Sequence, residues 1–315
     1  MQYTVQHTTW YAYTEPVPNC HNVVHLAPRN TARQTCHAHQ LLIEPVPSTL
    51  ARRSDYFGNA ADYFAVRGPL MGLKVTAESK LEVTEAPAFE KLDSPAWEEL
   101  ANVRGATYDR ESLEILQFTF ASPRVRLFAD MFRYAAQSFP AGRPILAAIR
   151  DLTTRIHADF KFDSRATTVN TPLDELLQLR RGVCQDFAHL AVGCVRSMGL
   201  AARYVSGYIC TQPPPGTPRL VGADASHAWA SVYCGAELGW IDIDPTNDMF
   251  ASDEHISIGW GRDYSDICPI QGVFVGGGDH TMGVSVDVIP QNPQVIPAQA
   301  GTQQQAQSQQ YIRLR

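Results

Sequence analysis

Residues 73–83 alternate strictly between two kinds of side chain. Every second position carries a small or mostly apolar residue, and the positions between carry lysine, threonine, glutamate or another polar residue. Successive side chains of a strand point to opposite faces, so this pattern places the apolar groups on one face of a sheet. Residues 3–13 alternate in the same way, and Gly58-Asn59 suits a hairpin turn between two aromatic-containing runs. We therefore expect an N-terminal antiparallel β domain over residues 1–88.

The pattern changes beyond this region. Residues 89–142 are interpreted as a helical connector, and apolar side chains recur at helical spacing over 145–160 and again over 184–198. Three further segments are predicted as strands: 201–210, 226–233 and 240–244. We expect an α+β fold in which residues 143–289 form a catalytic core. The Gln- and Pro-rich residues 290–315 cannot build a core, and we expect them to be disordered.

Composition narrows the function classes. The chain has 315 residues, 44% of them hydrophobic, a formal net charge of -6 and no long basic run, so nucleic acid is not an expected partner. The first residues lack the pattern of a signal peptide, and no apolar stretch is long enough to cross a bilayer. We expect a soluble cytoplasmic protein with no membrane partner. Oligomeric state is left open.

Cysteine spacing gives two further expectations. There are seven cysteines, widely spaced and without a C-x-x-C pair. An odd number without an export signal argues against a disulfide framework, and the spacing does not fit a zinc cluster. We expect no metal site and no cofactor.

Cys184 stands at the predicted start of a helix, and Gly182 before it permits a tight backbone entry. A helix N-terminus carries partial positive charge and unpaired N–H groups. Both favour a thiolate, and the N–H groups can stabilise the oxyanion that forms when sulfur attacks a carbonyl. The alternative interpretation is that Cys184 is a small, buried apolar residue of the core without a catalytic role.

A histidine and a carboxylate on the predicted strands complete a candidate triad. His227 can take the thiol proton and later return it, although a lone histidine is more often structural. Asp242 and Asp244 share one face of their strand, and either could orient the imidazole. Asp244 precedes Pro245, which ends the strand and holds the residue extended.

These segments resemble the core of the transglutaminase-like superfamily, in particular its bacterial branch with an N-terminal β domain. The resemblance lies in a cysteine, a histidine and an aspartate motif in the superfamily's order: Gly182–Ala188, Ser226–Trp229 and Trp240–Asn247. Three more stretches are similar to that branch: Leu26–Arg29, Tyr56–Asn59 and Gly261–Asp266.

The resemblance implies a papain-like or transglutaminase-like core, with the cysteine-bearing helix packed on an antiparallel sheet. It implies that Cys184 is the nucleophile, that His227 is the general base and acid, and that Asp244 orients His227. The implied reaction is acyl transfer at an amide bond of a peptide or protein through a thioester. Hydrolysis by a peptidase or amidase is the expected outcome.

Three other functions remain open. Transglutaminase-type transfer to an amine uses the same thioester. Arylamine acetyltransferases share the triad order, but their cysteine sits in a different motif. A non-catalytic binding or scaffold module is the alternative of a different class, although all three triad residues are present.

Several neighbours are candidates for supporting the site or lining the substrate cleft. On the cysteine helix these are Gln185 and Asp186, the latter more readily interpreted as structural. On the strands they are Trp229, Trp240 and Asp242. The two tryptophans are equally well interpreted as ordinary packing residues, and Asp242 as a hydrogen-bonded strand residue.

Overall fold

The computed structural model describes residues 1–101, 109–211 and 226–291. Over these residues the fold is α+β, as predicted, with two antiparallel sheets, a short parallel pair and a group of helices. No helix in the described part is long and apolar enough to cross a membrane. The predicted disordered tail, residues 290–315, begins too early, because Pro290 is the last residue of a strand, and from position 292 onward it lies outside the described residues.

The first sheet, here called the N-terminal sheet, has six strands. The two central ones are β1 (Gln2–Val24) and β4 (Ala60–Val83). Its outer strands are β2 (Gln34–Glu44) and β3 (Thr49–Ser54), which pair with β4, and β12 (Ile270–Val275) and β13 (His280–Pro290), which pair with β1. All of these pairings are antiparallel.

The predicted alternation is confirmed, because Leu73, Val75 and Leu81 face the interior and are at most 2% exposed. The predicted turn is also present between β3 and β4. Gly58 adopts a positive φ of 76° there and donates its N–H to the carbonyl of Asp55 at 3.1 Å. Glycine reaches that conformation without steric cost.

The pairing of β12 and β13 differs from the sequence interpretation, which assigned residues 143–289 to the catalytic core. Both strands lie in the N-terminal sheet, where Val24 pairs with Ile270 and Tyr3 pairs with Pro290. Alternation identifies a strand but not the sheet that it joins, since register is set by contacts distant in sequence. The first and last strands of the described chain therefore belong to one sheet.

The second sheet, here called the core sheet, has the order β10-β9-β8-β7-β11. Its strands are β7 (Ala202–Ile209), β8 (Ser226–Tyr233), β9 (Trp240–Asp244), β10 (Met249–Phe250) and β11 (His255–Gly261). A short parallel pair, β5 (Lys161–Phe162) with β6 (Arg181–Gly182), lies just before the cysteine helix in sequence. The three strands predicted for the core are present.

Six helices and three 3-10 turns complete the described elements. The helices are α1 (Trp97–Ala101), α2 (Arg110–Leu116), α3 (Ala129–Ala136), α4 (Ile145–Asp159), α5 (Leu173–Leu179) and α6 (Cys184–Ser197). The 3-10 turns are Phe89–Lys91, Gln117–Thr119 and Tyr264–Asp266. The helices predicted over 145–160 and 184–198 correspond to α4 and α6.

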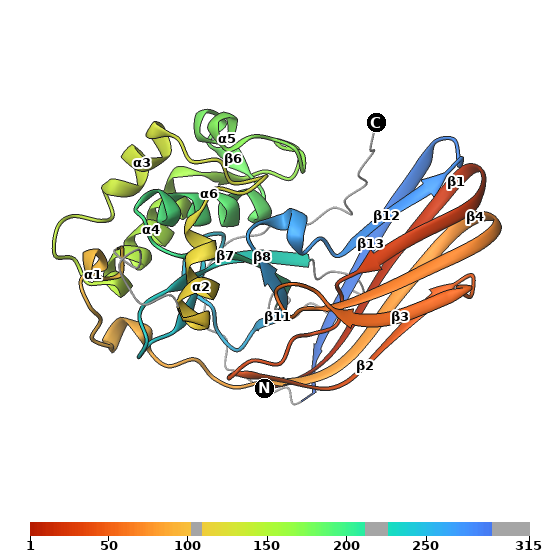
Figure 1. Cartoon of the computed structure of the whole chain (residues 1–315), viewed down its shortest axis with the longest axis horizontal. Coiled ribbons are helices and arrows are strands. Elements are labelled where there is room, and N and C mark those ends of the chain that lie inside the picture. The colour runs from red at the N-terminus through yellow and green to blue at the C-terminus, as the bar shows by residue number, and fades with distance from the viewer. Residues whose placement is uncertain (102–108, 212–225, 292–315) are drawn as a thin grey trace, which may run out of the picture.

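Helix α6 is the centre of the larger hydrophobic core. It packs against β7 and β8 on one side and against α3, α4 and α5 on the other. The side chains that it meets on the sheet are small or branched, among them Ala228, Ala230 and Val232. Figure 1 shows α3, α4, α5 and α6 grouped at one end of the molecule and the N-terminal sheet at the other end.

The residues of β8 and β9 that alternate with those packed beneath α6 form what is here called the outer face, which carries polar and aromatic side chains. His227, Trp229, Asp242 and Asp244 lie on it because paired residues of antiparallel strands share a face. Segments 26–34 and 55–59 of the N-terminal domain contact this part of the core. Polar side chains are therefore buried there between two parts of the chain.

Candidate active site

Cys184 is the first residue of α6 and is half-buried. The residue before it, Val183, has extended backbone and donates its N–H to the carboxylate of Asp186 at 2.9 Å. The same carboxylate oxygen accepts the Thr167 hydroxyl at 2.6 Å. Burial raises the pKa of Asp186, and these two hydrogen bonds partly oppose the rise. Asp186 is thus a buried cap of the helix that carries the cysteine.

Gly182 is required at this entry for its lack of a side chain. A Cβ atom at this position would lie 2.7 Å from Asp186 Oδ2 and 2.9 Å from Leu176 Cδ1. The predicted tight entry is therefore a close approach of the backbone to the Asp186 cap. Gln185, which the sequence suggested as a cleft residue, follows Cys184 in the first turn and is half-buried.

His227 and Asp244 meet on the outer face. His227 Nε2 lies 2.7 Å from Asp244 Oδ2, and both side chains are buried. Because Nε2–H donates to the carboxylate, Nδ1 is the ring nitrogen left for the thiol of Cys184, which acts on the same imidazole. Burial alone would lower the pKa of His227, but Asp244 and Cys184 together raise it to about 10. The structure thus brings Cys184, His227 and Asp244 together.

Asp244 is completely buried and accepts hydrogen bonds on both oxygens. Oδ1 accepts the backbone N–H of Thr246 at 2.9 Å, and Oδ2 accepts the Asn247 amide at 2.7 Å as well as His227. A third side chain, His255, lies 3.0 Å from Oδ2 through its Nε2. Burial would raise the pKa of Asp244, but the two histidines lower it well below its ordinary value.

The competing aspartate has different neighbours. Asp242 accepts the indole N–H of Trp229 at 3.0 Å, and its charge acts on the guanidinium groups of Arg33 and Arg203. Burial lowers the pKa of Arg203 to about 9, which Asp242 opposes. Asp242 therefore stabilises buried groups between the core and the N-terminal domain.

The two tryptophans suggested as cleft walls have separate surroundings. Trp229 is 0% exposed and packs edge-on against His255, so it lies inside the protein. Trp240 is half-buried, with the Arg203 guanidinium 4.3 Å from its ring centre and Phe118 edge-on at 5.4 Å. Both pack in the structure as ordinary aromatic residues do.

Two side chains at the carboxylate were not singled out from the sequence. Asn247 belongs to the aspartate motif and follows Asp244 by three residues, so its contact with Asp244 could have been expected from the sequence. His255 had no such signal, because it reaches Asp244 only through the pairing of β11 with β7.

His227, Asp244 and His255 also form a set of potential metal ligands, with one ligand atom from each lying within 4.8 Å of the others. Hydrogen bonding argues against this use. The backbone N–H of Ser252 donates to His255 Nδ1 at 3.1 Å, so the imidazole proton lies on Nε2 and points at the carboxylate. A protonated Nε2 has no lone pair for a metal. These donors fit a hydrogen-bond chain better than a metal centre.

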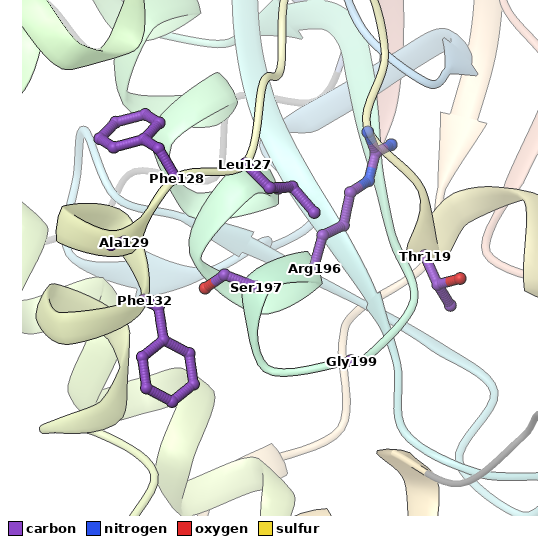
Figure 2. Close-up of a pocket in the computed structure, with 8 residues that line it drawn as sticks. All are labelled: Thr119, Leu127, Phe128, Ala129, Phe132, Arg196, Ser197 and Gly199. Atoms are coloured by element: carbon purple, nitrogen blue, oxygen red, sulfur yellow. The ribbon is translucent and has the colours of Figure 1, made fainter.

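A surface hollow of about 460 Å³ lies at the opposite end of α6, next to Ser197 and Gly199. Figure 2 shows Leu127, Phe128 and Phe132 beside it. Cys184 begins the helix, whereas this hollow surrounds its end, so the hollow is separate from the triad.

A helix that begins with cysteine, packed on an antiparallel sheet that supplies a histidine and an aspartate, is the architecture expected of transglutaminase-like enzymes. The sequence matches the Transglutaminase-like superfamily over residues 133–245 and the Bacterial transglutaminase-like N-terminal region over residues 3–82. The chain belongs to the transglutaminase-like superfamily, in the branch with the bacterial N-terminal region.

Relatives extend along most of the chain. An uncharacterized protein of Mycobacterium tuberculosis is 40% identical over 92% of this chain and 93% of its own length, and one of Mycobacterium leprae is 34% identical over 90% and 97%. A peptide-N(4)-(N-acetyl-beta-glucosaminyl)asparagine amidase of Gallus gallus is 29% identical over 33% of this chain and 14% of its own length. The solved structure of a candidate cysteine protease from Cytophaga hutchinsonii covers 96% of this chain and 94% of its own, with a TM-score of 0.74 and 17% identity. At that identity the likeness supports the fold.

Proposed function

We propose that this protein is a cysteine-dependent hydrolase that cleaves amide bonds of peptides or proteins through a thioester, with Cys184, His227 and Asp244 as its catalytic triad. The observation that carries the proposal is the buried pair of His227 and Asp244, 2.7 Å apart, with the Cys184 thiol acting on the same imidazole. The superfamily membership and the amidase among the relatives agree with it.

The first half of the reaction forms the thioester. With His227 carrying a proton on each nitrogen, its raised pKa favours a thiolate–imidazolium pair at neutral pH. The thiolate attacks the amide carbonyl, and the resulting oxyanion lies near the N–H groups of the first turn of α6, which have no acceptor within the helix. His227 donates its Nδ1 proton to the departing amine as the carbon–nitrogen bond breaks.

The second half releases the acyl group. A water molecule gives a proton to His227 Nδ1 and attacks the thioester carbonyl, and collapse of the tetrahedral intermediate breaks the carbon–sulfur bond. The products are a carboxylic acid and the restored thiolate–imidazolium pair. Through both halves Asp244 keeps Nε2 protonated and oriented, and it stabilises the charged ring.

Thiol reactivity provides the test that needs no substrate. An ordinary thiol is about 3% ionised at pH 7, and because His227 can take the thiol proton we expect Cys184 to react with iodoacetamide at least about 10-fold faster than an ordinary cysteine. Cys36, which is also partly exposed, is the internal comparison. Peptide-level mass spectrometry of the alkylated protein measures both rates, and His227→Ala should remove the difference.

Substrate screening then separates the possible acceptors. We expect a peptide library to yield cleaved products whose formation stops in Cys184→Ala. Adding a primary amine at millimolar concentration should leave hydrolysis as the main outcome, whereas dominant amide exchange would favour transglutaminase-type transfer. Equal alkylation of Cys184 and Cys36, unchanged in His227→Ala, would refute the enzymatic proposal.

A further inference from the structure

The Asp244 carboxylate has hydrogen-bond partners outside the triad, and one of them is a second histidine, His255. His255 reaches the same oxygen as His227, so that Oδ2 accepts from two imidazoles at 2.7 and 3.0 Å. We propose that His255 is a positioning residue of this site. It acts as a neutral hydrogen-bond donor that fixes Asp244 in the orientation in which it holds His227. This inference rests on the proposed function.

The protonation state of His255 follows from its second nitrogen. Nδ1 accepts the backbone N–H of Ser252 at 3.1 Å, and a backbone amide can only donate. Nδ1 is therefore unprotonated, which leaves the single ring proton on Nε2, facing Asp244. A second imidazolium at this carboxylate would compete with His227 for its charge, whereas a neutral donor does not.

Packing leaves His255 little freedom to turn. Its side chain is 2% exposed, and the ring of Trp229 stands edge-on to it with ring centres 5.2 Å apart. Trp229 is itself held by the hydrogen bond from its indole N–H to Asp242. The second aspartate of β9 thus acts on the triad indirectly, by fixing the aromatic ring against which His255 packs.

The N-terminal domain contacts the strand that carries His255. The side-chain amide of Gln34 donates to the Ser257 carbonyl at 2.7 Å and accepts the Ser257 N–H at 2.8 Å. Arg33 donates to the carbonyl of Ala251 at 3.3 Å, just before the turn that leads into β11. Both sides of the His255 segment are therefore attached to residues of the N-terminal domain, which makes this domain part of the support of the site.

Removing the donor while keeping a ring is the direct test. We expect His255→Phe to lower kcat on a cleaved peptide by about 10- to 100-fold with little change in KM, as loss of a partner that orients a catalytic group typically does. The rate of Cys184 alkylation at pH 7 should fall in parallel. His255→Gln, whose amide N–H can reach toward Asp244, should retain activity within about 5-fold of the wild type.

The controls separate this role from a structural one. His39→Phe removes a half-buried histidine that hydrogen-bonds Ser79 within the N-terminal sheet, and it should leave the alkylation rate unchanged. If His255→Phe reacts as the wild type does, or if the Gln variant is as slow as the Phe variant, the positioning role is refuted. If the wild-type Cys184 shows no enhanced reactivity, the proposed function fails first, and the two failures are thereby distinguished.

A measurement on the wild type covers the case in which His255→Phe does not fold. The imidazole nitrogen shifts in a ¹⁵N NMR spectrum at neutral pH report which nitrogen carries the proton. We expect His255 to be a neutral ring protonated on Nε2, and His227 to be doubly protonated. A His255 ring protonated on Nδ1, or charged, would overturn the inference.

Discussion

Asp242 and Asp244 lie two residues apart on one face of β9, and their neighbours give them different roles. Asp244 contacts His227 directly, whereas Asp242 contacts Trp229 and faces buried arginine side chains. From sequence alone the two were not separable, since period-2 alternation places both on the same face. The resemblance to the family favoured Asp244, and the observed contact to His227 agrees with that choice.

Replacing each aspartate should therefore damage a different property. We expect Asp244→Ala to lower kcat by about 10³- to 10⁴-fold, as loss of the orienting carboxylate does in other triads. Asp242→Ala should lower kcat far less but reduce the free energy of unfolding by about 1–3 kcal/mol, because the Trp229 N–H loses its buried acceptor. Peptidase assays and urea denaturation of both variants measure this. A larger loss of activity in Asp242→Ala would move the orienting role to Asp242.

The raised pKa of His227 gives a second prediction at this scale. The pKa of about 10 lies above the ordinary 6.5, so the protonated ring is favoured in the folded protein. The stability that this protonation contributes is complete below about pH 6.5 and is lost as the pH rises toward 10. Hydrolysis also needs the proton for the departing amine, so kcat/KM should fall above about pH 10.

The source of this shift can be tested with a conservative variant. Asp244→Asn removes the charge that raises the pKa of His227, so its residual activity should fall from a lower pH, nearer 6.5. Circular dichroism at each pH checks that both proteins remain folded. Alkaline limbs at the same pH in both proteins would show that Asp244 does not set the protonation of His227.

At the scale of single elements, the first turn of α6 depends on a close fit. Gly182→Ala would place a methyl group against Asp186 Oδ2 and Leu176 Cδ1, so the Asp186 cap must move. We expect a loss of about 1–3 kcal/mol in the free energy of unfolding, typical of an overpacked site, together with slower alkylation of Cys184 in the same turn. Thermal melts and the iodoacetamide assay provide the two measurements.

Gly68→Ala is the matched control for this change. Gly68 has a positive φ of 110°, but a Cβ atom added there would meet no other atom within 4 Å. The variant should therefore be destabilised through backbone strain, with no change in the reactivity of Cys184. Equal slowing of alkylation in both variants would mean that general loss of stability, rather than the fit at the cysteine helix, controls the thiol.

Elements defined by local periodicity were predictable, and elements defined by distant contacts were not. The helix that begins at Cys184 and the strand of His227 follow from spacing within about ten residues. The place of β12 in the N-terminal sheet depends on its pairing with β1, at the other end of the described chain, which no local pattern encodes. His255 was missed for the same reason, because its contact with Asp244 is made by sheet topology.

At the scale of the whole molecule, the N-terminal domain contacts β11, an edge strand of the core sheet. Strand β11 lies at the end of the strand order, so its outer N–H and C=O groups have no neighbouring strand among the described residues. Instead, two side-chain amides of the N-terminal domain form hydrogen bonds with the backbone of β11. Gln34 pairs with the backbone of Ser257, and Asn59 accepts the Trp260 N–H at 3.0 Å and donates to the Trp260 carbonyl at 2.7 Å.

The same contact includes two stretches whose sequences resemble the bacterial branch, Leu26–Arg29 and Tyr56–Asn59. Arg29 donates to Asn59 Oδ1 at 2.9 Å, and its guanidinium lies 3.6 Å from the ring centre of Trp260. The guanidinium of Arg203, on β7, lies 3.7 Å from the same ring centre. The N-terminal domain and the core therefore share one buried network, and we infer that neither part is stable alone.

Asn59→Ala tests this dependence. Asn59 is 0% exposed, and its loss leaves the backbone N–H and C=O of Trp260 without their partners in the protein, so we expect a loss of about 2–4 kcal/mol in the free energy of unfolding. Gln40→Ala removes an exposed side-chain amide that contacts Glu78 and should cost less than about 0.5 kcal/mol.

Because β11 carries His255, the midpoint for loss of Cys184 reactivity in urea should shift together with global unfolding in Asn59→Ala. A fragment lacking residues 1–85 that folds and retains fast Cys184 alkylation would contradict the dependence, since that fragment has neither amide at the β11 edge and no β1 to pair with β12 and β13.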